Sequence, residues 1–279
     1  MGSRSDSTSR RCQSSARTPP HHDHNTAYAL TRVNYNSHIS QLPYRFNIFM
    51  TAQAPSQDAL PSRFGMILFP GFQPLDVFGP LGIFNIFSRT QKTSLSIIAA
   101  TLDPVSTSTD PNAAFQQSVL PTHTFASPPP DLEVLFVPGG MGTRAPESEL
   151  AEMLAYIRHV YPQLRYIISI CTGGGVIARA GVLDGRRATT NKLAWAQTVA
   201  HGPKTYWVAK ARWVVDGNIY SSSGVTAGID ATLAWISAVY GEETAKNLAV
   251  GIEHNRVEDP ADDPFATYYG VSDVPPVQQ

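Results

Sequence analysis

The chain has 279 residues, of which 42% are hydrophobic and 15% charged, and its formal net charge is −1 at pH 7. This balance supplies enough apolar material for a sizeable core, and without a basic face or tract we expect no nucleic-acid partner. No apolar run reaches the roughly 18 residues that a membrane-spanning helix needs, so we also expect no membrane partner.

The cysteine content indicates a reducing compartment. Cys12 and Cys171 are the two cysteines of the chain, too few for a disulfide framework, so we predict a cytoplasmic protein. No Cys/His cluster has the spacing of a zinc site, and no glycine-rich phosphate-binding motif stands between a strand and a helix. We therefore predict neither a metal nor an organic cofactor.

The two ends of the chain differ from its middle. Residues 1–60 form an extension whose first part, Met1–Asn25, is rich in Ser, Arg, His and Pro and is predicted to be disordered. Its Arg-rich, acid-poor composition is also typical of an organelle transit peptide, the alternative to a cytoplasmic location. We predict a catalytic domain over 61–258 and an extended, Pro- and Asp-rich tail over 259–279.

Hydrophobic patterns predict alternating strands and helices from Phe64 onward. In chain order they are a strand over Gly65–Phe69, a helix over Val77–Phe87, a strand over Leu95–Ala100, one or two small hairpins within 104–125, and a strand over Val134–Val137. The second half continues with a helix over Glu147–Val160, a strand over Tyr166–Ile170, a helix over Thr172–Ala180 that ends at Gly181, a hairpin over Arg212–Ser222 with an Asp-Gly turn, and helices over Gly228–Tyr240 and Glu242–His254. This alternation predicts an α/β fold with a mostly parallel sheet and a small antiparallel hairpin.

The stretch Tyr166–Gly175 places Cys171 directly after an apolar strand and before small residues that open a helix. A sharp turn from strand to helix presents a nucleophile at the corner. A helix N-terminus favours negative charge, so we expect a lowered thiol pKa and a reactive thiolate. The alternative is that Cys171 is a small buried hydrophobic residue, as many free cysteines are.

Three predicted strand ends carry residues that suit chemistry, and ligands of open α/β sheets bind at such ends. Asp76 follows the first strand, Gly139 and Gly140 follow the third, and Cys171 follows the fourth. We interpret Asp76 as a helix N-cap, with acid–base chemistry beside Cys171 as the alternative. The two glycines either form a sharp loop or let backbone N–H groups stabilise developing negative charge.

Other polar residues are expected near the same edge of the sheet. Thr172 is either a first-turn helix residue or a donor to a reaction intermediate, and Thr190 and Asn191 rim the pocket if a short strand precedes them. A Cys–His mechanism needs an imidazole near the sulfur, but no histidine follows a predicted strand.

Five sequence blocks occur in the order typical of a known family. The chain resembles the ThiJ/PfpI superfamily, with its class I glutamine-amidotransferase-like fold, and within it the isocyanide hydratase group. The resemblance covers residues 64–256 and rests on the blocks Leu68–Pro80, Val137–Gly140, Ile170–Gly173, Ala180–Thr190 and Gly224–Asp230.

The resemblance implies a flavodoxin-like three-layer sandwich, with Cys171 as nucleophile and Asp76 where isocyanide hydratases carry an acidic residue. It also implies a homodimer that acts on a small-molecule substrate, and a site completed by Thr172, Gly139, Gly140, Gly173, Thr190 and Asn191. Many relatives have histidines where this chain has Thr172 and Asn191, which argues against any Cys–His activity.

The function that this resemblance implies is hydration of an organic isocyanide to an N-substituted formamide, through a covalent thioimidate on Cys171. The alternative is a non-catalytic redox sensor or stress-protective protein, because an accessible low-pKa cysteine oxidises readily. A third reading is a glyoxalase or deglycase activity, against which the missing histidines argue.

Overall fold

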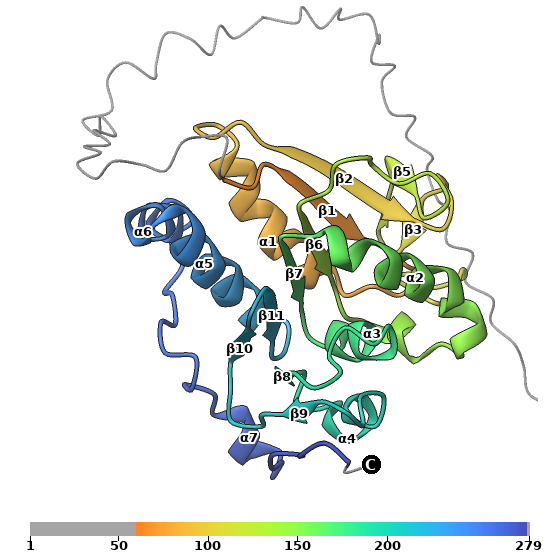
Figure 1. The fold of residues 1–279 in the computed structure, drawn as a ribbon. Coiled ribbons are helices and arrows are strands. Elements are labelled where there is room, and N and C mark those ends of the chain that lie inside the picture. The colour runs from red at the N-terminus through yellow and green to blue at the C-terminus, as the bar shows by residue number, and fades with distance from the viewer. Residues whose placement is uncertain (1–59, 278–279) are drawn as a thin grey trace, which may run out of the picture. The chain divides into compact units, whose positions relative to one another are not determined.

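The structure of the protein is a computed structural model that describes residues 60–277. The prediction that the N-terminal extension is disordered falls on residues 1–59 and lies outside this range. The described chain places a sheet between two layers of helices (Figure 1), as the sequence predicts.

The central sheet has seven strands in the order β10-β11-β7-β6-β1-β2-β5. All neighbours pair in parallel except β10 and β11, which form an antiparallel hairpin at one edge. The mostly parallel sheet and the hairpin are therefore confirmed. The strands are β1 (Arg63–Ile67), β2 (Ser94–Ala99), β5 (His123–Thr124), β6 (Val134–Val137), β7 (Tyr166–Ser169), β10 (Trp213–Asp216) and β11 (Ile219–Ser222).

Helices cover both faces of the sheet (Figure 1). One face carries α1 (Pro74–Phe87), α5 (Ala227–Tyr240) and α6 (Glu242–Gly251), and the other carries α2 (Glu147–Val160) and α3 (Gly173–Arg179). Every residue of β6 is buried, because helices pack against both of its sides. Within the described range no helix is both long and apolar enough to cross a bilayer.

Several short elements were not predicted, because two to five residues are too few to show a period. They are β8 (Arg187–Ala188) paired in parallel with β9 (Tyr206–Trp207), the helix α4 (Trp195–Val199), and 3-10 turns at Met141–Arg144 and Tyr161–Gln163. Within 104–125 one hairpin forms, between β3 (Val105–Ser106) and β4 (Ser118–Val119).

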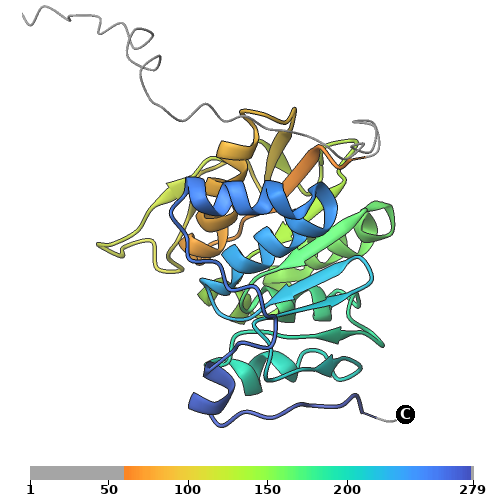
Figure 2. The same ribbon diagram turned by 90° about the vertical axis from the view of Figure 1, so that its left-hand side faces the viewer.

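The C-terminal segment is not extended throughout, in contrast to the prediction for 259–279. It contains the short helix α7 (Phe265–Tyr268), and after it the chain runs beside β9 (Figure 2). Trp207 and Val274 exchange two backbone hydrogen bonds of 2.9 Å, and the Ala209 N–H donates to Asp273 at 2.8 Å. These bonds anchor the tail to the domain.

The topology brings three loops to one crevice. The chain leaves β1 for β2 on one side and later returns as β6 on the other side of β1, so a switch point lies between β1 and β6. Loops at the carboxyl ends of strands separate at such a point and leave room for a ligand. Asp76, Gly139 and Cys171 follow β1, β6 and β7 and converge there.

The hairpin turn gives the first testable prediction. Gly217 has φ +62° in the two-residue loop between β10 and β11, so Gly217→Ala should lower the free energy of unfolding by about 1 kcal/mol. Gly82 is exposed inside α1 with open space at its Cβ position, so Gly82→Ala should raise the same quantity by roughly 0.5–1 kcal/mol. Urea denaturation of both variants measures the two changes in the free energy of unfolding. If both changes had the same sign, the assigned turn would be contradicted.

Candidate active site

Cys171 stands at a strained bend between β7 and α3. Its φ is +57°, a left-handed conformation that costs a residue with a Cβ about 1–2 kcal/mol. Hydrogen bonds on both sides hold the bend: the Cys171 N–H donates to the Ser223 carbonyl at 3.0 Å, and the Thr190 hydroxyl donates to the Cys171 carbonyl at 2.8 Å. The predicted sharp turn from strand to helix is therefore present at this cysteine.

Asp76 does not cap its helix, in contrast to the favoured prediction. α1 begins at Pro74 after Gln73, so Asp76 already lies within the first turn. Its side chain is fully buried, and its Oδ2 accepts a hydrogen bond from the Gly139 N–H at 2.9 Å. Oδ1 has no aligned donor within residues 60–277, and the Cys171 side chain is close enough to hydrogen-bond to this carboxyl. The alternative role beside the cysteine is the one that the geometry supports.

Burial sets the ionisation of this pair. It raises the pKa of Asp76 to about 7, although the hydrogen bonds from Gly139 and Cys171 oppose the rise. Burial and the adjacent Asp76 carboxylate raise the pKa of Cys171 to about 12. Around neutral pH the thiol therefore keeps its proton, while the Asp76 carboxyl is partly protonated and partly ionised.

The predicted low thiol pKa is therefore wrong. The sulfur does have donors: the backbone N–H groups of Val225 and Thr172 and the side chain of Asn191 each lower the pKa of Cys171. Their combined effect is smaller than that of desolvation and of the neighbouring carboxylate, because only 6% of Cys171 is exposed. The same donors are placed to stabilise negative charge on sulfur.

The glycine loop after β6 serves the protein's own groups. The Gly139 N–H binds Asp76, and the Gly140 N–H donates to the Thr172 hydroxyl at 3.0 Å, where the Thr143 hydroxyl also donates at 3.0 Å. A Cβ at Gly139 would lie 2.6 Å from the Thr172 nitrogen, and one at Gly173 would lie 2.2 Å from the Val137 carbonyl oxygen. Close approach explains these glycines, and oxyanion binding by them stays a prediction.

Thr190 and Asn191 follow the short strand β8 and lie beside the cysteine. Asn191 lines a hollow, whereas Thr190, which was also predicted to rim the pocket, is fully buried and lines neither hollow near the bend. Thr190 binds the Cys171 carbonyl. The Asn191 Oδ1 accepts the Ala194 N–H at 3.0 Å, which leaves its amide nitrogen as the donor toward the sulfur. A Cβ at Gly224 would lie 2.9 Å from that nitrogen, so the glycine makes room for it.

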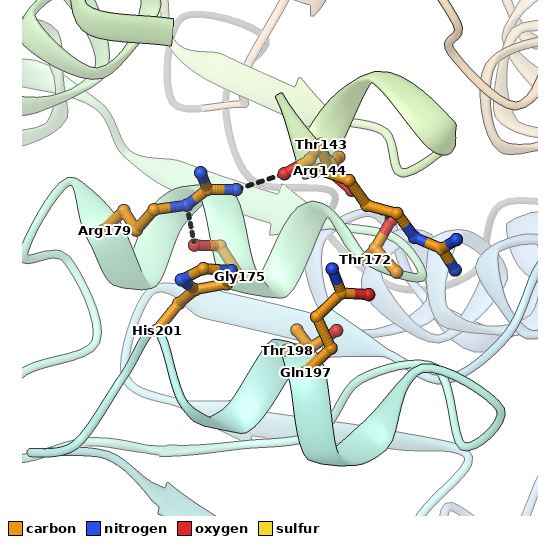
Figure 3. A pocket seen from close by; sticks show the side chains of 8 residues that line it. All are labelled: Thr143, Arg144, Thr172, Gly175, Arg179, Gln197, Thr198 and His201. Atoms are coloured by element: carbon orange, nitrogen blue, oxygen red, sulfur yellow. Dashed lines mark hydrogen bonds between the residues drawn. The ribbon is translucent and has the colours of Figure 1, made fainter. Parts of the chain in front are cut away.

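Two hollows lie near the bend. A small one of about 10 Å³ lies beside Thr172, Gly175 and His201 (Figure 3), and it is at the lower limit of the space that one water needs. A larger one of about 220 Å³ lies beside Asn191, and its lining includes Ser223 and Val225. Cys171 lines neither hollow, but Asn191, Ser223 and Val225 all contact Cys171.

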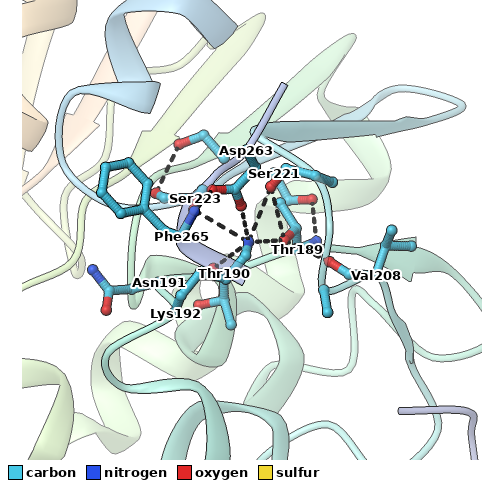
Figure 4. A network of polar contacts seen from close by, with 12 residues as sticks. Thr189, Thr190, Asn191, Lys192, Val208, Ser221, Ser223, Asp263 and Phe265 are labelled. Carbon is cyan, nitrogen blue, oxygen red and sulfur yellow. Dashed lines mark hydrogen bonds and ion pairs between the residues drawn. The ribbon is translucent and has the colours of Figure 1, made fainter. Parts of the chain in front are cut away.

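A buried lysine beside the site was missed by the sequence analysis. Lys192 forms an ion pair with Asp263 at 3.1 Å, and both side chains are only 1% exposed (Figure 4). Its Nζ also donates to the Thr189 hydroxyl at 2.7 Å, the Thr190 carbonyl at 3.1 Å and the Ser223 hydroxyl at 3.2 Å. Burial lowers the pKa of Lys192 to about 8, although Asp263 opposes this. A single lysine in a polar loop carries no sequence signal for such burial.

Asp230, in the sequence block Gly224–Asp230, has a structural role. Asp230 is fully buried and accepts hydrogen bonds from Arg212 at 2.7 Å and from the Val257 N–H at 3.1 Å, and it pairs with the His254 ring at 2.7 Å. These bonds join α5 to the chain after α6. No group of three or more His, Cys, Asp or Glu side chains within 60–277 is placed to hold a metal ion.

A buried cysteine at a strand-to-helix bend, beside the carboxyl edge of a parallel sheet, defines an α/β protein whose bend has the backbone geometry of a nucleophile elbow. Residues 63–238 match the model of the DJ-1/PfpI family. The chain belongs to this family, which confirms the resemblance described above.

Individual relatives agree with this assignment. The isonitrile hydratase of Pseudomonas putida is 34% identical over 192 residues, which cover 69% of this chain and 78% of that protein. The crystal structure of a ThiJ/PfpI family protein from Pseudomonas syringae is 28% identical, with a TM-score of 0.60, and the match covers 78% of this chain and 87% of the other. Drosophila melanogaster DJ-1beta, 20% identical over 70% of this chain and 99% of its own, shares the fold with a TM-score of 0.57.

The raised pKa of Asp76 makes stability depend on pH. Because its folded pKa of about 7 lies above the ordinary value of 3.8, the folded state loses stability as pH rises from about 4 to about 7. Asp76→Asn keeps an acceptor for the Gly139 N–H and removes this loss, so it should gain about 4 kcal/mol over the parent between pH 4 and pH 8. Thermal unfolding at both pH values measures the gain, and a difference that does not change with pH would contradict the buried carboxyl.

Proposed function

We propose that this protein is a cysteine-dependent hydratase that converts organic isocyanides to N-substituted formamides. The observation that carries the proposal is the Asp76 carboxyl buried against the Cys171 thiol at the elbow. The similarity to an isonitrile hydratase supports the same reaction. The side chains that affect the thiol pKa are Asp76 and Asn191, neither of which is an imidazole, so chemistry that uses a single carboxyl suits this site.

The first half of the reaction needs one proton carrier. Ionised Asp76 takes the thiol proton while the sulfur electron pair forms a bond to the terminal carbon of the isocyanide. Asp76 then gives that proton to the same carbon, which yields a thioimidate on Cys171. The N–H groups of Val225 and Thr172 stabilise the charge on sulfur as the proton leaves. A carboxyl with a pKa of about 7 suits this role, because it both accepts and releases a proton near neutral pH.

The second half of the reaction uses the same carboxyl. Asp76 takes a proton from a water molecule whose oxygen bonds to the thioimidate carbon. The carbon–sulfur bond then breaks, the substrate nitrogen and the sulfur each gain a proton, and the formamide leaves. In sum one isocyanide and one water give one formamide, and both Cys171 and Asp76 return to their starting states.

The raised pKa of Cys171 argues against the redox-sensor alternative. Oxidation by peroxide proceeds through the thiolate, and a thiol with a pKa of about 12 is almost fully protonated at neutral pH. The glyoxalase alternative needs an imidazole beside the sulfur, where this chain has the side chain of Asn191.

Removal of the nucleophile is the direct test. Cys171→Ala should abolish hydration of phenyl isocyanide, and Asp76→Asn should reduce kcat by about 10²–10⁴-fold, as is typical for a positioned acid–base group. Cys12→Ser is the matched control and should keep the parental rate. Intact-mass spectrometry during turnover should detect one isocyanide on Cys171. Parental turnover by Cys171→Ala would exclude the proposed reaction.

The dependence of the rate on pH separates this mechanism from one with a preformed thiolate. The active form has Asp76 ionised and the thiol protonated, so kcat/KM should rise with pH through about 7 and then level off. Initial rates with phenyl isocyanide between pH 6 and pH 9 measure the profile. A rate that keeps rising tenfold per pH unit up to pH 9 would indicate thiolate attack instead.

A further inference from the structure

The hollow of about 220 Å³ has a wall that comes from the C-terminal segment. Phe265, the first residue of α7, and Tyr269, which follows its last residue, line this hollow together with Asn191. The Tyr269 N–H donates to the Phe265 carbonyl at 2.9 Å, so the two rings stand one helical turn apart on one face of the segment. Tyr268, on the same segment, does not line the hollow and is 79% exposed.

Three other residues that line this hollow contact Cys171. Ser223 accepts the Cys171 N–H at 3.0 Å, the Val225 N–H interacts with the sulfur, and the Asn191 side chain does the same. Cys171 itself does not line the hollow, and these three residues stand between the hollow and Cys171 in the chain of contacts. The aromatic wall of the hollow is about half exposed, with Phe265 at 47% and Tyr269 at 42%, so both rings have apolar surface left to bury.

The ion pair between Lys192 and Asp263 holds this wall in place. The Asp263 Oδ1 accepts the Phe265 N–H at 2.9 Å, and the carboxylate pairs with Lys192 (Figure 4). Lys192 also binds the Thr190 carbonyl, and the Thr190 hydroxyl binds the Cys171 carbonyl. One chain of polar contacts therefore links the aromatic segment to the elbow.

The geometry points to a substrate-specificity site: Phe265 and Tyr269 bind the N-substituent of the isocyanide, and the Lys192–Asp263 pair positions them beside Cys171. The inference rests on the proposed function and adds the substrate class. A dry cavity of about 150 Å³ is enough for benzene, so a hollow of about 220 Å³ accommodates one aromatic ring with its isocyanide group and little more. The preferred substrates are isocyanides with a single aryl ring.

Kinetics with two substrates test the wall. Phe265→Ala and Tyr269→Ala should each raise the KM for phenyl isocyanide about tenfold, the effect of losing one aromatic contact, with kcat within about twofold of the parent. The KM for methyl isocyanide should not change. Tyr268→Ala is the matched control and should leave both substrates unaffected. Unchanged KM values in both wall variants would overturn the inference.

A larger substrate should respond to Phe265→Ala in the opposite direction, with a gain in rate. The intact hollow should reject 2-naphthyl isocyanide, with kcat/KM at least tenfold below that of phenyl isocyanide. Phe265→Ala enlarges the hollow and should narrow this gap by raising the naphthyl rate. A general loss of fold lowers both rates together, so a selective gain separates specificity from damage. A fall in both rates by the same factor would count against the aromatic wall.

The ion pair is tested in the same assay. Asp263→Ala removes the acceptor of the Phe265 N–H and should raise the KM for phenyl isocyanide, while Asp263→Asn keeps that acceptor and should restore part of the loss. Asp273→Ala is the control, because it loosens the same tail at a residue away from the hollow. An equal rise in KM for Asp263→Ala and Asp273→Ala would overturn the positioning role.

A binding measurement separates this inference from the proposed reaction. Calorimetry on the Cys171→Ala protein should detect binding of N-phenylformamide that weakens about tenfold with Phe265→Ala added and does not change with Tyr268→Ala added. If the parent protein turns over no isocyanide and this pattern holds, the aromatic site stands and the hydratase function fails. If isocyanides are hydrated but Phe265→Ala does not change the affinity for N-phenylformamide, the function stands and the aromatic site is overturned.

Discussion

The buried contact between one thiol and one carboxyl is the constraint on which this site depends. Burial disfavours the charged form of both groups, and the Asp76 carboxylate also disfavours a thiolate, so the pair loses one proton, from Asp76, as pH rises through about 7. In the proposed reaction this pair acts as both acid and base. The strained elbow, the glycine loop and the helix that carries Asp76 all serve to keep these two side chains together and dry.

The scaffold supplies that contact from three distant parts of the chain. β1 leads into the helix of Asp76, β6 leads into the Gly139 N–H that orients its carboxylate, and β7 ends at the bend of Cys171. The bend is held by Ser223 and Thr190, which belong to segments far beyond it in the sequence. Local strain at the cysteine is therefore sustained by long-range hydrogen bonds, which a rigid parallel sheet keeps in register.

The regular elements and the elbow followed from the sequence because they depend on local patterns. The bounds of β6 and α2 match the predicted ranges, since apolar periodicity and a proline before α2 mark them. Asp76 was read as a cap because an aspartate near a helix start is a local signal, and its true partner, Gly139, is remote in the sequence. The thiol pKa was misjudged for the same kind of reason: burial depth and a neighbouring carboxylate are tertiary facts. Lys192 shows most clearly what local sequence patterns cannot predict, because no neighbouring residue in the chain indicates that its partner is the distant Asp263.

The buried ion pair between the Asn191 loop and the tail also bears on how this protein can evolve. Replacing one partner alone leaves a charge without water or counter-ion, whereas replacing both with apolar residues of similar volume removes the problem. Substitutions at positions 192 and 263 are therefore expected to occur together across related sequences. A pair of charged residues that covaries in this way would mark which descendants have kept the C-terminal segment folded against the domain.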